Sequence, residues 1–327
     1  MKNQKSFFLI LLLTGILIIM VTIVGFSPFS LSENISPQIL GKKTFLPGKR
    51  KGLLRPTSSL TPTLTPTSTP AFTPTPTPIP ANCIMPTNYP PPPVGGMTYA
   101  NWYFYKQDIN SITNRFKIYN DPGLTSHLYL QLYDGRIDGI GYYFGVQTTH
   151  LVLFSRWETT DLANVRTGPN AYKITSTSEG SFVGLRLKYD ISATTYTTHL
   201  QRAEFDGVGD WYDLYITKEG ETGLGTYVGG VRFPRSNPLI PASLWDGGGT
   251  WTEFWDNNNN TTLYPVPLWH VGIYPPLANN QWSPVEVRTH YSAMPNSDAY
   301  FDKTENIVQM TIGDETPRCH PAALLPL

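Results

Sequence analysis

The chain has 327 residues with 24 basic and 24 acidic side chains, so its formal net charge is zero. Such a chain lacks the basic surface that nucleic-acid binding needs, and we expect no nucleic-acid partner. Only 15% of the residues are charged and 13% are aromatic, a composition typical of strand-rich exported proteins, including those that handle carbohydrate.

The N-terminus begins with a long apolar segment. Residues 7–26 carry no charge, and as a helix they would be about 30 Å long, enough to span a bilayer. The following SPFSLSEN is a poor match to a signal-peptide cleavage site. We therefore predict a signal anchor over residues 1–30, with a cleaved signal peptide as the alternative. Both predict an extracytoplasmic protein at the cell surface, either anchored to the membrane through this helix or secreted.

Residues 31–82 have the composition of a linker, first basic and then rich in Thr and Pro. Repeated Thr-Pro over residues 55–80 fixes φ at every second residue and removes backbone donors. We expect an extended, polyproline-II-like spacer, which at about 3.1 Å per residue reaches about 80 Å. Such a spacer would hold a domain away from the membrane or carry it through a cell wall.

The two cysteines bracket the remainder of the chain. Cys83 directly follows the spacer and Cys319 lies near the C-terminus. In an exported protein this arrangement predicts one disulfide that joins the two ends of a domain. Two free thiols would instead require a reducing compartment, which an export signal argues against.

Residues 83–320 show the period-two alternation of strands. Examples are RFKIY (115–119), HLYLQLY (127–133), FVGLRLKY (182–189) and DWYDLYI (210–216). Gly- and Asp-rich turn signals recur about every ten residues, and no twelve-residue window carries a helical stripe. We predict an all-β domain of roughly a dozen strands in two packed antiparallel sheets, a β-sandwich or jelly roll, followed by a tail at 321–327.

The stretch GYYFGVQTTHLVLFSRW (141–157) predicts a hairpin in the core. Its first strand alternates, whereas 151–154 is apolar on both sides, as in a central strand whose outer face is covered. At its end, Arg156 and Trp157 enter the next loop and are candidate ligand-binding residues.

This stretch also carries a family resemblance. Together with SEGSFVGLRLKYD, YTTHLQRAEFDGVGDWYDLYI and VGGVRFPR it resembles the GYFGIQ, LFSxW and EGSG-type motifs of a family of exported bacterial proteins of unknown function. The resemblance covers about residues 134–235. It implies a concanavalin-like or jelly-roll sandwich, and it implies no catalytic residue because none is established for the family.

Two strands present the chemistry of a sugar-binding surface. Trp211, Asp213 and Tyr215 should share one face of a strand, as should Trp251, Glu253 and Trp255. Flat rings stack on pyranose rings, and neighbouring carboxylates bond to hydroxyl groups. The alternative is that these are ordinary outward faces of a large sandwich, exposed or covered by its own loops.

Signals for catalysis or metal binding are weaker. Glu204 and Asp206 alternate like the acids of an E-x-D-x-E strand in sandwich-fold glycanases, but the third position is Val208, so a hairpin end with solvated acids is favoured. The six histidines lack zinc-site spacing, and no nucleophile elbow or phosphate-binding loop is present. We expect no cofactor, although DGRIDG (134–139) and DNNNNTT (256–262) could hold calcium.

Three functions remain open. The favoured one is noncatalytic binding of a polysaccharide or cell-wall glycan. The alternatives are a glycoside hydrolase or polysaccharide lyase that uses Glu204, Asp206 or Asp213, and a structural or adhesive envelope protein.

Overall fold

The protein is seen in a computed structural model that describes residues 83–84, 95–124, 127–177, 180–254, 266–291, 296–313 and 316–327. These residues form 18 strands and one 3-10 helix. The elements are β1 (Gly95–Tyr103), β2 (Ser111–Ile118), β3 (Leu128–Ile137), β4 (Ile140–Gln147), β5 (Leu151–Trp157), η1 (Leu162–Asn164), β6 (Val165–Thr167), β7 (Ala171–Ser176), β8 (Phe182–Lys188), β9 (Thr195–Phe205), β10 (Gly209–Lys218), β11 (Thr226–Pro234), β12 (Gly247–Phe254), β13 (Trp269–Ile273), β14 (Leu277–Ala278), β15 (Glu286–Tyr291), β16 (Ser297–Asp302), β17 (Ile307–Ile312) and β18 (Ala323–Pro326). The predicted all-β domain is confirmed. The strands outnumber the predicted dozen partly because β6, β14 and β18 are too short to show a pattern.

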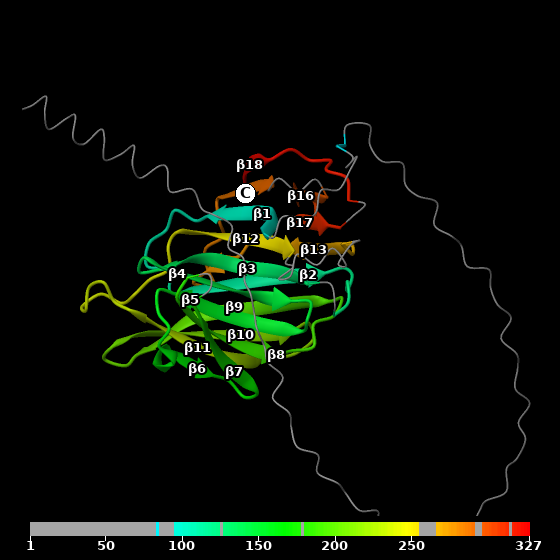
Figure 1. The fold of residues 1–327 in the computed structure, drawn as a ribbon. Helices are drawn as coiled ribbons and strands as arrows, with labels where there is room; N and C mark the ends of the chain where they lie inside the picture. The colour runs from blue at the N-terminus through cyan, green and yellow to red at the C-terminus, as the bar shows by residue number, and fades with distance from the viewer. Residues whose placement is uncertain are drawn as a thin grey trace, which may run out of the picture. The chain divides into compact units, whose positions relative to one another are not determined.

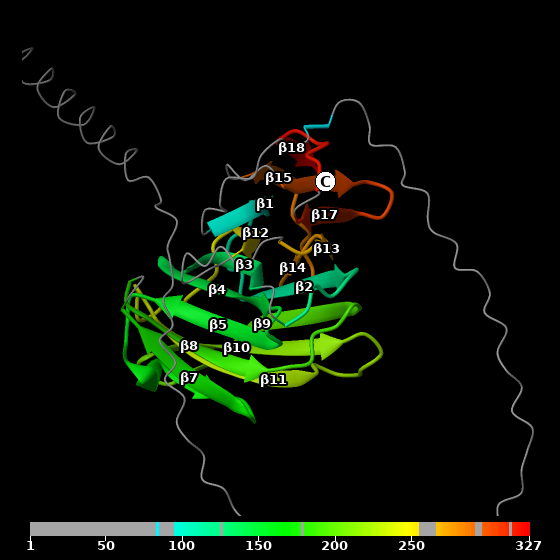
Figure 2. The same ribbon diagram turned by 45° about the vertical axis from the view of Figure 1, so that its right-hand side comes forward.

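The strands form two antiparallel sheets that pack face to face. The first sheet has the order β18-β15-β1-β12-β3-β4-β5-β8-β7, and the second has the order β16-β17-β13-β2-β9-β10-β11-β6, with β14 paired to β2. Between the sheets, β1 contacts β16 and β17, and β11 contacts β5 and β8. Figures 1 and 2 show β5 beside β8 and β10 beside β11 in both views. The architecture is the predicted antiparallel β-sandwich.

The inner faces of both sheets supply one aromatic-rich core. Its largest fully buried side chains are Trp102, Trp269, Tyr133, Tyr142, Tyr196, Tyr212, Phe104, Phe116, Phe144, Phe154 and Phe233. Apart from Phe104, which follows β1, these rings come from nine strands that include members of both sheets, so their burial stabilises the packing of one sheet on the other.

The hairpin of β4 and β5 lies near the middle of the first sheet, as predicted. Phe144 pairs with Phe154 across the hairpin, and both face the core. On the opposite side of β5, Leu153 is also buried. The prediction that β5 is covered on both faces is therefore confirmed.

A bulge in β3 changes one predicted alternation. The register shifts between Gln131 and Tyr133, so Leu132 and Tyr133 are both buried in the core. Strict period-two alternation through HLYLQLY (127–133) predicts Tyr133 on the same face as Gln131, opposite Leu132. An extra residue in one strand moves every later residue of that strand to the opposite face of the sheet. Asp134 therefore lies on the outer face.

The two ends of the domain are joined by the predicted disulfide. Cys83 and Cys319 are bonded, and the neighbouring Ile84 and Arg318 exchange backbone hydrogen bonds of 2.9 and 3.1 Å. Residues 321–327 were expected to form a tail, but β18 within them pairs with β15 at the edge of the first sheet. The sheet therefore continues to the C-terminal end of the chain.

The predicted signal anchor at 1–30 and the whole of the predicted linker at 31–82 lie outside the described residues. Within the described ranges, no helix is long and apolar enough to cross a membrane.

Candidate ligand-binding faces

The outer face of β10 is arranged as predicted. Tyr212, Leu214 and Ile216 are fully buried in the core, so the alternate residues Trp211, Asp213 and Tyr215 lie on the opposite face of the second sheet. Across the strand pairs, Glu204 of β9 lies opposite Trp211, and Tyr227 of β11 lies opposite Tyr215.

The ring of Trp211 is covered by two arginines. The guanidinium carbons of Arg166 and Arg232 lie 4.7 and 5.5 Å from the ring centroid. The indole N–H donates to Asp206 Oδ2 at 2.9 Å, and only 8% of the residue is exposed. A sugar would have to displace charged groups to stack here. Trp211 is therefore poorly placed for the predicted role, although its place on the outer face is as expected.

Asp213 is neutralised by Arg166. The guanidinium donates from Nε to Asp213 Oδ1 at 3.0 Å and from Nη2 to Oδ2 at 2.8 Å, while the Tyr227 hydroxyl donates to Oδ1 at 3.0 Å. The third guanidinium nitrogen, Nη1, donates to Glu204. Gly230 makes room for this pair, because a Cβ there would lie 2.2 Å from Asp213 Oδ1. This charge cluster satisfies its own members and offers no free carboxylate.

Asp206 is held in the turn between β9 and β10. Its Oδ1 accepts from the backbone N–H groups of Val208 and Gly209, and its Oδ2 accepts from Arg232 at 2.8 Å. The hydrogen bond from Arg232 lowers the pKa of Asp206 well below its usual range. Glu204, Asp206 and Asp213 are thus all paired with arginines, so none of them is a free carboxyl group that could act on a glycosidic bond.

Arg156 and Trp157 do not form a shared site. Arg156 pairs with Tyr142 and Val183, faces the interior and donates to the Arg232 carbonyl. Burial lowers its pKa to about 10. The strand continues through both residues, so neither enters a loop as expected. Trp157 lies on the outer face of the first sheet, half-buried, with its ring centroid 5.9 Å from that of Tyr143.

The second predicted sugar-binding strand, β12, lies in the first sheet. Thr250, Thr252 and Phe254 face the core, so Trp251 and Glu253 share the outer face as predicted. Trp255, the third predicted member, lies outside the described residues.

Residues from distant segments complete this face. Tyr99 of β1 lies opposite Trp251 on one side and opposite His290 of β15 on the other. Its ring stacks on His290 at 4.5 Å with an interplanar angle of 1°, and its centroid lies 6.2 Å from that of Trp251. Asn101 Nδ2 lies 3.2 Å from His290 Nε2. We call Tyr99, Asn101, Trp251, Glu253 and His290 the β12 cluster.

The β12 cluster differs from the face of β10 in its electrostatics. All five residues are half-buried, and Glu253 has no ion pair with any described residue. Burial raises the pKa of Glu253 to about 7, although hydrogen bonding by Trp251 opposes this shift. Burial also lowers the pKa of His290. This face therefore has half-buried rings beside a carboxyl group that forms no ion pair with any arginine in the described part of the chain.

A second carboxyl group lies on the same face. Asp134 of β3 is opposite Gly249 of β12, which shares its side of the strand with Trp251. Burial raises the pKa of Asp134 to about 7, and Arg136 opposes the shift in part. Asp134 was considered only as part of a calcium loop, because the bulge that places it beside the β12 cluster has no sequence signal.

The pKa of Glu253 gives a test of this geometry. A carboxyl group whose pKa is higher in the folded than in the unfolded chain destabilises the fold as pH rises from about 4.5 to about 7. We expect Glu253→Gln to be stabilising by about 1 to 3 kcal/mol above pH 7 and to have little effect near pH 4. Chemical denaturation across this range would measure it, with the exposed Glu219→Gln as control. A pH-independent difference would contradict the assigned environment of Glu253.

The metal predictions stay open. Among the described residues, no group of three His, Cys, Asp or Glu side chains could hold a metal ion. Of the two proposed calcium loops, DNNNNTT lies outside the described part of the chain, and Asp138 of DGRIDG accepts a 2.8 Å hydrogen bond from Ser236 Oγ.

In comparisons with known proteins, no protein-family model and no curated protein matches the chain.

Proposed function

We propose that this is an exported, surface-tethered protein whose sandwich domain binds carbohydrate, such as a cell-envelope glycan, at the β12 cluster without catalysing a reaction. The observation that carries the proposal is the pair of half-buried rings of Tyr99 and Trp251 beside the amide of Asn101 and beside Glu253, which has no ion pair with a described residue. Rings supply stacking area, and the carboxyl and amide groups supply hydrogen bonds that orient hydroxyl groups. The apolar N-terminus, the Thr-Pro spacer and the disulfide support display outside the cell.

The spacing of the acids favours binding over hydrolysis. Glu253 lies four residues along β12 from Gly249, the position opposite Asp134. At about 3.4 Å per residue this offset is roughly 14 Å. Glycosidases use carboxyl pairs separated by about 5 to 10 Å. The two acids are therefore better placed to contact different parts of a bound chain than to act on one glycosidic bond.

Binding to insoluble polysaccharides tests the proposal. We expect a fragment covering residues 83–327 to sediment with at least one of cellulose, xylan, chitin or purified peptidoglycan. Trp251→Ala should lower this binding at least about tenfold, because a stacked ring contributes much of the affinity. The matched control is Trp245→Ala, which removes an exposed tryptophan in the connection between β11 and β12.

Three results would overturn the proposal. Failure of the fragment to bind any of the four polymers would favour a structural or adhesive role. An equal loss of polysaccharide binding in the Trp251→Ala and Trp245→Ala variants would show that the β12 cluster is not the binding site. Release of reducing sugars or of unsaturated products would show a hydrolase or a lyase.

A further inference from the structure

Large apolar side chains are exposed together at one end of the sandwich. Leu239 is 90% exposed and Ile240 57% exposed in the connection between β11 and β12, and Trp245 of the same connection is 53% exposed. Phe205 and Val208, at the adjoining turn of β9 and β10, are exposed as well. Single exposed apolar residues are common, but five on two contacting loops are not expected without a partner.

The two loops are in direct contact through Arg235. Its guanidinium carbon lies 3.7 Å from the centroid of the Phe205 ring, and its Nη1 donates to the Pro238 carbonyl at 3.1 Å. Through Arg235 the Phe205 ring adjoins the connection that carries Leu239 and Ile240, and we call these two loops with their exposed apolar side chains the apolar end.

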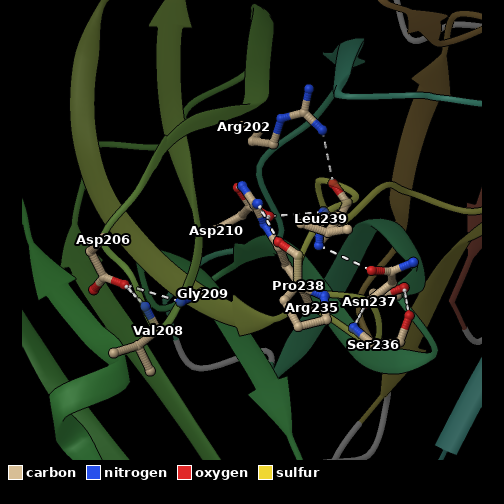
Figure 3. Close-up of polar contacts among 12 residues, drawn as sticks. Arg202, Asp206, Val208, Gly209, Asp210, Arg235, Ser236, Asn237, Pro238 and Leu239 are labelled. Carbon is tan, nitrogen blue, oxygen red and sulfur yellow. Dashed lines mark hydrogen bonds and ion pairs between the residues drawn. The ribbon is translucent and has the colours of Figure 1, made fainter.

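A buried polar network fixes the base of the connection, as Figure 3 shows in part. Asp210, 2% exposed, accepts from Arg235 Nε at 2.7 Å and Nη2 at 2.8 Å, and from the Ala242 N–H at 2.8 Å. The Ala242 carbonyl in turn accepts from Arg202 at 3.1 Å and from the Tyr212 hydroxyl at 2.7 Å. The connection is therefore anchored to both β9 and β10.

The tip of the connection is also shaped by hydrogen bonds. The Asn237 side-chain oxygen accepts a 3.0 Å hydrogen bond from the Leu239 N–H (Figure 3). The Asn237 backbone carbonyl accepts a second one, also 3.0 Å long, from the Ile240 N–H. Ser236 donates to Asp138 in the turn between β3 and β4. Leu239 and Ile240 thus project from a constrained backbone, so little conformational entropy is lost when they bind.

We infer that the apolar end docks on a lipid bilayer by inserting Leu239 and Ile240 at its surface. A protein partner needs a complementary surface of about 800 Å². At 90% exposure Leu239 projects beyond the surface around it, so it can enter an apolar medium before that surface comes into contact. A fluid apolar medium requires no such complementarity.

The residues beside the tip suit the bilayer interface. The Arg136 guanidinium carbon lies 5.2 Å from the Trp245 ring centroid, and Trp and Arg are enriched at membrane surfaces. Three of the acids of this end, Asp138, Asp206 and Asp210, accept hydrogen bonds from neighbouring residues. Their charges are therefore partly offset and oppose the approach of a lipid headgroup less, whereas Asp246, directly after Trp245, is exposed and would stay in the aqueous layer.

Flotation with phosphatidylcholine vesicles tests the inference. The fragment of residues 83–327 retains every described strand pairing and the disulfide, so it can be used without the apolar N-terminus. We expect it to float with the vesicles in both 0.1 and 0.5 M NaCl. The double variant Leu239→Ser with Ile240→Ser should bind at least about tenfold more weakly, because two apolar side chains are lost from the contact.

The matched control is Leu224→Ser, which removes a 51% exposed leucine from the turn between β10 and β11, at the other end of β10. It should bind like the unmodified fragment, and the melting temperatures of all variants should agree because the replaced residues are exposed. The inference is overturned if the unmodified fragment does not float, if 0.5 M NaCl releases it, or if both variants lose binding equally. It is also overturned if the apolar end forms a dimer that the double variant abolishes.

Discussion

Replacing both Cys83 and Cys319 by Ser should lower the free energy of unfolding of the domain by about 5 kcal/mol. The bond closes a loop with a sequence separation of 236 residues. Without it, the unfolded chain gains the freedom that closure of such a long loop removes, whereas the folded chain keeps the backbone hydrogen bonds between Ile84 and Arg318. For a domain of this size the loss corresponds to a fall in melting temperature of roughly 10 to 20 °C.

Thermal unfolding of the fragment of residues 83–327 measures this effect. The unmodified fragment treated with a reductant is the matched control, and its melting temperature should fall to that of the double serine variant. In the serine variant the reductant should change nothing. A difference under about 3 °C between oxidised and reduced protein, or a further fall on reducing the variant, would contradict the prediction.

The sandwich could be predicted because period-two alternation is a local signal, and the disulfide because the chain has just two cysteines, which bracket the domain. Alternation in β10 is reproduced residue by residue, with Tyr212, Leu214 and Ile216 in the core. The exceptions are the bulge in β3 and the pairing of β18. A bulge depends on how one strand fits against its neighbours, and the pairing of a short edge strand depends on which partner strand is available. Neither feature therefore has a recognisable sequence pattern.

The candidate sites were predicted less completely, because a face is assembled from several strands. Trp211 and Trp251 looked alike in sequence, each followed two residues later by an acid. What separates them is the partner of that acid. Asp213 meets Arg166 from β6, whereas Glu253 meets no arginine among the described residues. The contribution of Tyr99 and His290 follows from strand order, which periodicity alone does not reveal.

The second large effect is expected from the network at the apolar end. Asp210 is almost fully buried and bonded to Arg235 and to the Ala242 N–H. Burial raises its pKa, but the hydrogen bonds from Arg235 and Ala242 outweigh this and lower it overall. Asp210→Ala would leave a guanidinium and an N–H without their acceptor. We expect it to lower the free energy of unfolding by about 3 to 5 kcal/mol near neutral pH.

Because the folded-state pKa of Asp210 is lowered, its stabilising contribution is present at neutral pH and is lost as pH falls through the acidic range. The difference between Asp210→Ala and the unmodified fragment should therefore shrink in acid. Glu219→Ala is the matched control. It breaks an exposed pair with Arg115 at 3.4 Å and should have an effect of less than about 1 kcal/mol.

Hydrogen exchange then separates local from global effects. The Ala242 amide donates its hydrogen bond to Asp210. Replacing Asp210 should therefore speed hydrogen exchange of the Ala242 amide more than that of amides in the central hairpin of β4 and β5. If the Ala242 amide stays as protected as in the unmodified fragment, the carboxylate does not hold the connection. Leu239 and Ile240 would then project from a loop that the network does not constrain. If its exchange rises while vesicle binding weakens in the same variant, the rigid presentation of these two side chains is part of how the apolar end contacts lipid.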